Sequence, residues 1–159
     1  MTLFWLLVLS ATVAFGATLA NLTLTGTVPL ILDISVTPTP AASAVDLAVT
    51  QPQLKVADVT VRTNSPAGYL VTVRSDNVSN GDCSAPCFYS TSTTDSLAFV
   101  LYRSGAPIGF AGDTETFIQT TSGIGGDTYT AAVSFDGALA LLGAANDYGD
   151  FLVFTVSVN

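Results

Sequence analysis

The chain has 159 residues, of which 49% are hydrophobic, and a net charge of -8. Four basic residues against twelve acidic ones are too few cations for a phosphate backbone, so nucleic acid is not expected as a partner. The sequence contains no histidine, which excludes Ser-His and Cys-His catalytic pairs, and no enzymatic activity or cofactor is expected. The length is enough for one domain with a hydrophobic core.

Residues 1–16 are predicted to be a cleavable secretory signal peptide. The apolar run from Leu3 to Phe15 has the length of a signal-peptide core and is short for a membrane span of about 20 residues. Small residues favour cleavage after Gly16 or, as an alternative, after Ala20. We therefore expect a secreted protein of the periplasm or cell surface, with no membrane association once the leader is removed.

The next segment alternates between apolar and polar residues with a period of two, which is typical of a half-buried strand. The apolar positions are Leu22, Leu24, Val28, Leu30, Leu32, Ile34 and Val36. Gly26 has no side chain to pack and Pro29 has no N–H for a ladder, so the pattern predicts two strands with a break between these residues. Residues 17–28 are then an apolar N-terminal arm carrying a first strand, and residues 29–159 are the folded domain.

Prolines interrupt the pattern over residues 37–44, and a short strand is predicted over residues 45–50. In the strand predicted over residues 54–63, the apolar residues change parity, which predicts a β-bulge near Ala57 and Asp58. The turn residues 64–68 lead to a strand over residues 69–75, predicted to pair with the preceding strand as a hairpin.

The second half of the chain continues with short apolar segments between turn residues. An excursion off the sheet is expected over residues 76–94, and a central strand over residues 97–102, because both of its faces are apolar. Further strands are predicted over residues 115–120, 129–135 and 151–158, with a loop over residues 137–146. The many short strands predict an all-β fold, an antiparallel immunoglobulin-like β-sandwich.

Two cysteines, Cys83 and Cys87, are separated by three residues. A redox motif normally has two residues between the cysteines, and an exported chain favours oxidation. A structural disulfide that closes a small loop is therefore predicted.

Two further kinds of site are possible, each with an ordinary structural alternative. Acidic residues beside glycine loops could bind calcium, or could only cap turns; they are Asp113, Glu115 and Asp127. Four tyrosines could line a sugar site, or could only be core and sheet residues; they are Tyr69, Tyr102, Tyr129 and Tyr148.

Both ends of the chain resemble chaperone-usher pilins and the related spore coat protein U. The shared features are the alternating segment Asn21–Val28 followed by Pro29, and an ending with Tyr148-Gly149-Asp150-Phe151 before an alternating last strand. In that family, an alternating arm with a glycine at one position fills the groove of a neighbouring subunit. Many of its members carry a cysteine in the first strand, whereas residues 22–36 contain none.

The leading hypothesis is an exported structural or adhesive subunit of a bacterial surface assembly that polymerises by strand donation. The resemblance implies homo-oligomers or related subunits as partners through the arm, and a periplasmic chaperone as a possible further partner. Alternate pockets of the neighbour would take Leu22, Leu24, Val28 and Leu30, and Gly26 would lie at the tightest point. The alternative is a self-contained secreted sandwich that binds glycan or protein through its loops, with the arm paired in its own sheet.

Overall fold

The computed structural model describes residues 22–121, 123–137 and 142–159, so the predicted signal peptide lies outside the described residues. A five-stranded sheet has the order β1 (Leu32–Pro38), β2 (Gln51–Thr63), β9 (Gly125–Phe135), β6 (Val100–Arg103), β7 (Ala106–Ile108). A three-stranded sheet has the order β10 (Leu152–Val158), β3 (Tyr69–Ser75), β8 (Thr114–Gln119). A small ribbon pairs β4 (Cys87–Tyr89) with β5 (Ser96–Ala98), and two short helical segments are η1 (Pro40–Ser43) and α1 (Asp76–Asn80).

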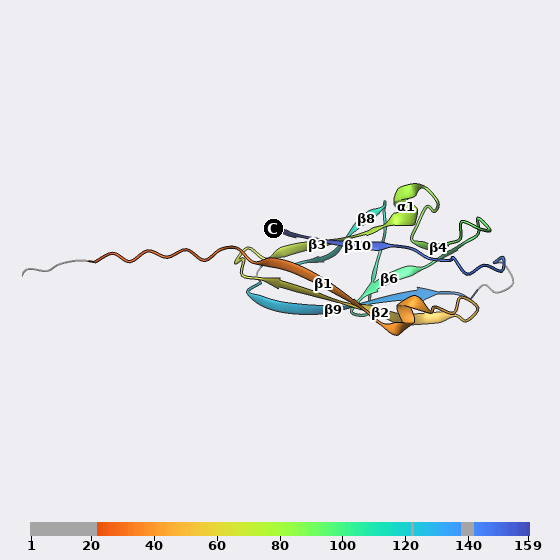
Figure 1. The fold of residues 1–159 in the computed structure, drawn as a ribbon, viewed down its shortest axis with the longest axis horizontal. Coiled ribbons are helices and arrows are strands. Elements are labelled where there is room, and N and C mark those ends of the chain that lie inside the picture. Colours follow the sequence, from red (N-terminus) through yellow and green to blue (C-terminus); the bar gives the residue numbers. More distant parts are fainter. Residues whose placement is uncertain (1–21, 122, 138–141) are drawn as a thin grey trace, which may run out of the picture.

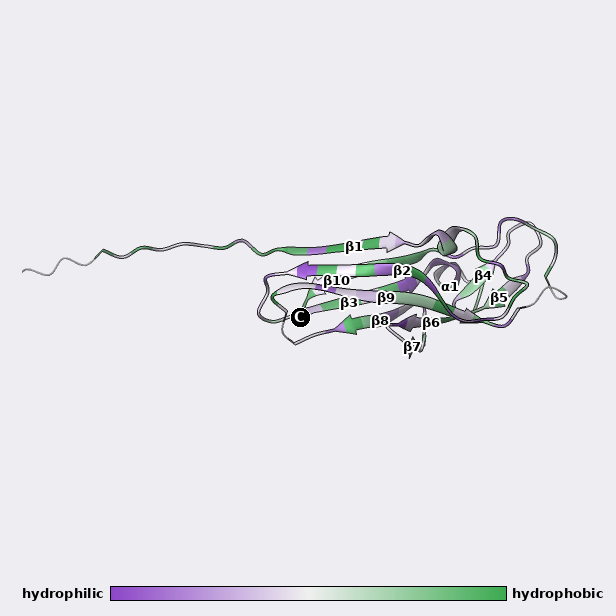
Figure 2. Ribbon diagram, turned by 90° about the horizontal axis from the view of Figure 1, so that it is seen from below, coloured by the Kyte–Doolittle hydropathy of each residue, from purple (hydrophilic) through white to green (hydrophobic). Residues whose placement is uncertain are grey.

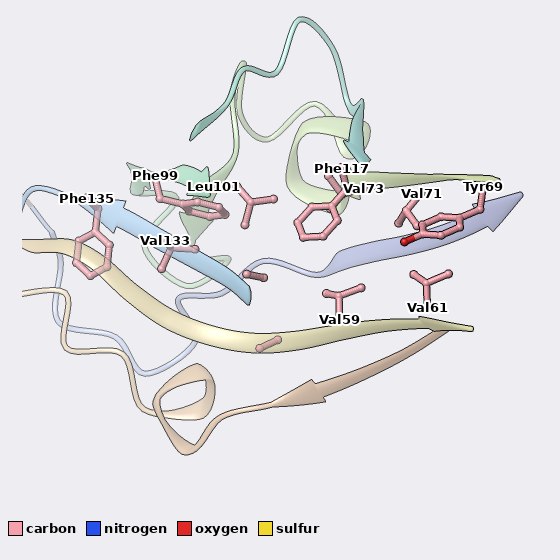
Figure 3. Close-up of a cluster of buried hydrophobic side chains, with 12 residues drawn as sticks. Val59, Val61, Tyr69, Val71, Val73, Phe99, Leu101, Phe117, Val133 and Phe135 are labelled. Carbon is pink, nitrogen blue, oxygen red and sulfur yellow. The ribbon is translucent and has the colours of Figure 1, made fainter. Parts of the chain in front are cut away.

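Every strand pair in the described part of the chain is antiparallel, which confirms the predicted all-β, antiparallel class. The two larger sheets lie on opposite sides of one hydrophobic core (Figures 1 and 3). Alternate residues of each strand point inward, as the period-two pattern predicted. Core residues on the larger sheet include Val59, Val61, Leu101 and Val133, and those on the smaller sheet include Tyr69, Val71, Val73 and Phe117.

The change of parity in β2 is accommodated by a bulge, as predicted. The pairing of β2 with β9 shifts register between Lys55 and Ala57, one residue before the expected position. Because of the extra residue, Leu54, which precedes the shift, and Val59, which follows it, both face the core; Leu54 packs against it and Val59 is fully buried.

The predicted hairpin between β2 and β3 is wrong. These strands lie in different sheets: β2 pairs with β1 and β9, whereas β3 pairs with β10 and β8. The turn between them crosses from one sheet to the other, and it contains a hydrogen bond from the Gly68 N–H to the Ser65 carbonyl. Crossing places the buried faces of β2 and β3 opposite one another, whereas a hairpin would have left both facing the same way.

The predicted strand over residues 45–50 is also wrong, because this segment forms a turn and a bend. The Asp46 carboxylate accepts a hydrogen bond from the Ala48 N–H at 2.9 Å, the local turn geometry that aspartate favours over a ladder. Val45 and Leu47 still pack against the core.

The predicted central strand over residues 97–102 is divided in two. β5 pairs with β4, and β6 pairs with β9 and β7. Between them, the N–H of buried Phe99 donates to the Pro86 carbonyl, so the chain changes partners at this residue.

The described helices are all too short to cross a membrane. Residues 22–30 leave the sandwich at one end and extend away from it (Figures 1 and 2). The loop 142–150 and the β4–β5 ribbon lie at the other end (Figure 1). The extended segment, residues 22–30, is called the arm below.

Candidate functional site

The arm carries the most exposed large hydrophobic side chains of the described chain. Leu22, Leu24 and Val28 are 83%, 84% and 83% exposed, and Leu30 is 60% exposed. In the single chain these side chains are left largely exposed, although alternation is the pattern of a strand with one buried face. The strand predicted for the arm therefore has no partner in its own sheet, contrary to the arm pairing expected in the alternative, and regular pairing begins only at Leu32.

Gly26 lies in the middle of the arm, and a Cβ atom added there would meet nothing within 4 Å. The lone chain therefore gives no steric reason for glycine at this position. The arm also carries no charge, since the first charged residue of the sequence is Asp33.

Two strands form open edges on the side of the sandwich where the arm begins. β1 is the last strand of the larger sheet and β10 the last strand of the smaller one; they lie close together but form no ladder with each other. Core-facing residues along both edges are only partly covered; they are Leu32 and Ile34 on β1 and Leu152, Phe154 and Val156 on β10.

The four edges of the two larger sheets differ in how well they are protected against further strand pairing. β7 is three residues long and contains Pro107, β8 contains Glu115 and pairs through a register shift, and β1 contains Asp33 and ends at Pro38. β10 has seven residues, Leu-Val-Phe-Thr-Val-Ser-Val, with no charge, no proline and no register shift in its pairing. Such an edge is a template for another strand.

The Cys83–Cys87 disulfide is present, as predicted, at the end of the sandwich opposite the arm. Beside it, the Asn77 amide nitrogen donates to the carbonyls of Cys87 at 2.8 Å and Gly149 at 2.7 Å. Asn77 begins a glycosylation sequon, but a glycan would replace one of the two hydrogens on this nitrogen, so the two bonds could not both be kept. Asn77 therefore joins α1, β4 and the loop before β10.

Because Cys83 and Cys87 are bonded and are the two cysteines of the sequence, labelling of the unreduced protein with a thiol reagent should find no free sulfhydryl. Mass spectrometry of the alkylated protein before and after reduction measures this. Reduction should expose two thiols, and labelling without reduction would contradict the assignment.

The Asp147 carboxylate joins two loops at the same end. It accepts hydrogen bonds from the hydroxyls of Ser90, Thr91 and Ser92 and from the Ser92 N–H. These bonds, that of Ser90 first, hold the pKa of Asp147 below its usual range. Nearby, burial is the main cause that raises the pKa of Asp150, although its carboxylate accepts a hydrogen bond from Ser75.

Three of the four candidate tyrosines fall into two separate hydrogen-bond networks. The Tyr69 hydroxyl lies 2.8 Å from an Asp127 oxygen and 2.7 Å from the Tyr129 hydroxyl. Burial, followed by these two bonds, raises the pKa of Tyr69. Tyr148 instead donates to the Gly143 carbonyl at 2.9 Å and lines a cavity of about 510 Å³ with Phe88 and residues 42–48.

The candidate calcium ligands do not gather into one site. Asp127 accepts the bond from Tyr69, and Glu115 accepts one from the Ala111 N–H at 2.8 Å. Within residues 22–121, 123–137 and 142–159, no three His, Cys, Asp or Glu residues are grouped so as to hold a metal ion.

In the part of the chain that the structure describes, these features define an antiparallel all-β protein of two packed sheets, with one disulfide, one unpaired apolar arm and one unprotected sheet edge. Comparison with models of known protein families gives no match, and no curated protein matches the sequence.

Proposed function

We propose that the protein is an exported structural or adhesive subunit of a bacterial surface assembly, which polymerises by donating its arm to the sandwich of a second copy. The observation that carries this proposal is the exposure of Leu22, Leu24, Val28 and Leu30 on an arm with no partner in its own sheet. Large apolar side chains at alternate positions are the pattern of a strand that binds an open sheet edge, where backbone bonds give affinity and pockets select side chains.

The edge of β10 is the proposed acceptor. On its open side β10 pairs with no further strand, and the arm, residues 22–30, is long enough to pair with all seven residues of β10. An added strand would also cover the partly exposed side chains of Leu152, Phe154 and Val156, which already pack against the core. The arm would thereby complete the open side of the sandwich.

The charge distribution supports association through these two segments. Each chain has a net charge of -8, so two copies repel one another at long range. The arm and β10 contain no charged residue, so their contact adds no like-charge pair. Salt screens the remaining repulsion, and assembly should accordingly be faster at 0.5 M than at 0.05 M ionic strength.

The remaining parts of the proposal concern topology and location. We assign the sandwich to the immunoglobulin-like, pilin-like type, and residues 1–16 to a signal peptide removed after Gly16. The Cys83–Cys87 disulfide agrees with an oxidising compartment outside the cytoplasm. A chaperone that covers the β10 edge before assembly would suit a subunit with so open an edge.

A synthetic peptide of residues 21–31 tests the proposal directly. Added in excess to the chain with residues 1–31 deleted, the peptide should bind the β10 edge and raise the melting temperature. At a peptide concentration of 100 times Kd, the free energy of unfolding should increase by about 2.7 kcal/mol. Added to the full mature chain, the peptide should compete with the arm and shorten the polymers, as measured by size-exclusion chromatography with light scattering.

A control peptide with Leu22 and Leu24 replaced by aspartate should have neither effect. A mature chain that stays strictly monomeric at high concentration, with a melting temperature that the peptide does not change, would contradict strand donation.

The loop-binding alternative has one supporting observation, the cavity of about 510 Å³ between residues 42–48 and 142–148. Its volume lies in the range of small-ligand sites, and Phe88 and Tyr148 offer the aromatic rings on which sugars stack. Binding of a glycan by a strictly monomeric chain would favour this function.

A further inference from the structure

We propose that Asn64 is a positioning residue that holds the backbone where the β1–β2 ladder ends and directs the arm away from its own domain. This proposal rests on the proposed function, because an arm that folded back onto its own sheet could not bind a second copy. The proposed role of Asn64 is to keep the arm free to bind a second copy, and the hydrogen bonds at the base of the arm are the observation behind it.

The register of the ladder places Asn64 opposite Ile31. The last regular pair is Leu32 with Thr63, and the next step outward brings the Asn64 N–H to the Ile31 carbonyl at 3.3 Å. In a regular antiparallel pair the Ile31 N–H would donate to the Asn64 carbonyl. It donates instead to the side-chain oxygen Oδ1 of Asn64, at 2.7 Å.

The next hydrogen-bonded pair in the same register would join Pro29 to Pro66. Neither proline has an N–H, so no backbone bond can form there, and the ladder must stop. The side chain of Asn64 supplies the missing donor: its Nδ2 donates to the Pro29 carbonyl at 2.8 Å.

One side-chain amide thus binds the backbone on both sides of Leu30, at the Pro29 carbonyl and at the Ile31 N–H. Holding two backbone groups fixes the direction in which the chain leaves the domain. The arm beyond this point continues outward, in line with β1 (Figure 1). Asn64 therefore acts on assembly through the arm, without itself belonging to the surface that pairs with β10.

The experiment compares wild type, Asn64→Ala and Asn64→Asp. The control is Asn80→Ala, which removes an exposed asparagine away from the base of the arm. Alanine removes both contacts, whereas aspartate keeps the acceptor for the Ile31 N–H and loses the donor to Pro29. Amide hydrogen exchange at Ile31 should become roughly three- to tenfold faster in Asn64→Ala, and should stay protected in Asn64→Asp and Asn80→Ala.

A second readout reports the direction of the arm whether or not the protein assembles. The distance distribution between spin labels at Thr25 and Thr116 should broaden in Asn64→Ala and Asn64→Asp, and should not change in Asn80→Ala. Melting temperatures should remain close to wild type, because the contacts lie at the exposed edge of the fold.

Polymerisation of both Asn64 variants should be at least threefold slower than that of wild type and of Asn80→Ala. If wild type assembles and both variants assemble at the same rate, the positioning role is overturned while the proposed function stands. If wild type does not assemble, the proposed function fails, and the exchange and distance measurements still decide the role of Asn64: unchanged values in Asn64→Ala overturn it.

Discussion

Replacing Phe117 by alanine is expected to lower the free energy of unfolding by about 3–5 kcal/mol, the usual cost of a large cavity in a packed core. The Phe117 side chain is fully buried and makes edge-to-face contacts with Tyr129 on the larger sheet and with Phe154 on β10. The distances between ring centroids are 6.5 Å to Tyr129 and 5.0 Å to Phe154. It therefore joins both sheets and supports the strand proposed as acceptor. Urea denaturation followed by fluorescence measures the change.

The matched control is Phe151→Ala. Phe151 immediately precedes β10, but its side chain is 78% exposed, so its removal should change the free energy of unfolding by less than about 0.5 kcal/mol. Similar losses in the two variants would mean that the core does not depend on Phe117 as the packing indicates.

The strand pattern was predictable from the sequence wherever burial on one face governs residue choice. The strand from Tyr69 to Ser75 was predicted with its observed bounds, and its odd-numbered residues are buried. The bulge in β2 was predictable for the same reason, since keeping Leu54 and Val59 on one face required an extra residue.

Strand partners were not predictable from the same pattern. A hairpin and a crossing between sheets both bury alternate residues of β2 and β3, so parity does not distinguish them. The order of strands depends instead on the turn after Thr63 and on contacts between residues far apart in the sequence. The strand predicted over residues 45–50 is absent for another reason: the backbone forms a local turn at Asp46 in place of a ladder.

The arm could be located from the sequence, but its state could not. Alternating leucines are typical of an edge strand in its own sheet and equally of a free strand. Gly26 and Pro29 predicted a break, and regular pairing begins after it, at Leu32. The contacts of Asn64 were not predictable from the sequence because its partners lie 33 and 35 residues away. That Pro29 lies opposite Pro66 can be seen only once the register is known.

Changing Leu22 and Leu24 together to aspartate is expected to abolish assembly and leave the domain folded. Each leucine is worth roughly 1.5–3 kcal/mol when buried, so the pair should weaken association by about 3–6 kcal/mol, or about 10²- to 10⁴-fold in Kd. The domain should keep its melting temperature, since both side chains are more than four-fifths exposed in the single chain (83% and 84%). Size-exclusion chromatography and thermal melting of the mature variant measure the two effects.

The matched control changes Thr23 and Thr25 to aspartate. It adds the same charge to the same segment, but on the opposite face, because successive side chains of a strand point to opposite sides. Charge repulsion should weaken assembly equally in both variants, whereas loss of apolar packing affects the leucine variant alone. Strand donation therefore requires polymers that persist in the threonine variant and disappear in the leucine variant. Equal loss in both variants would mean that the added negative charge, and not the lost apolar packing, prevents assembly. A lower melting temperature confined to the leucine variant in a monomeric protein would mean that the arm packs on its own domain.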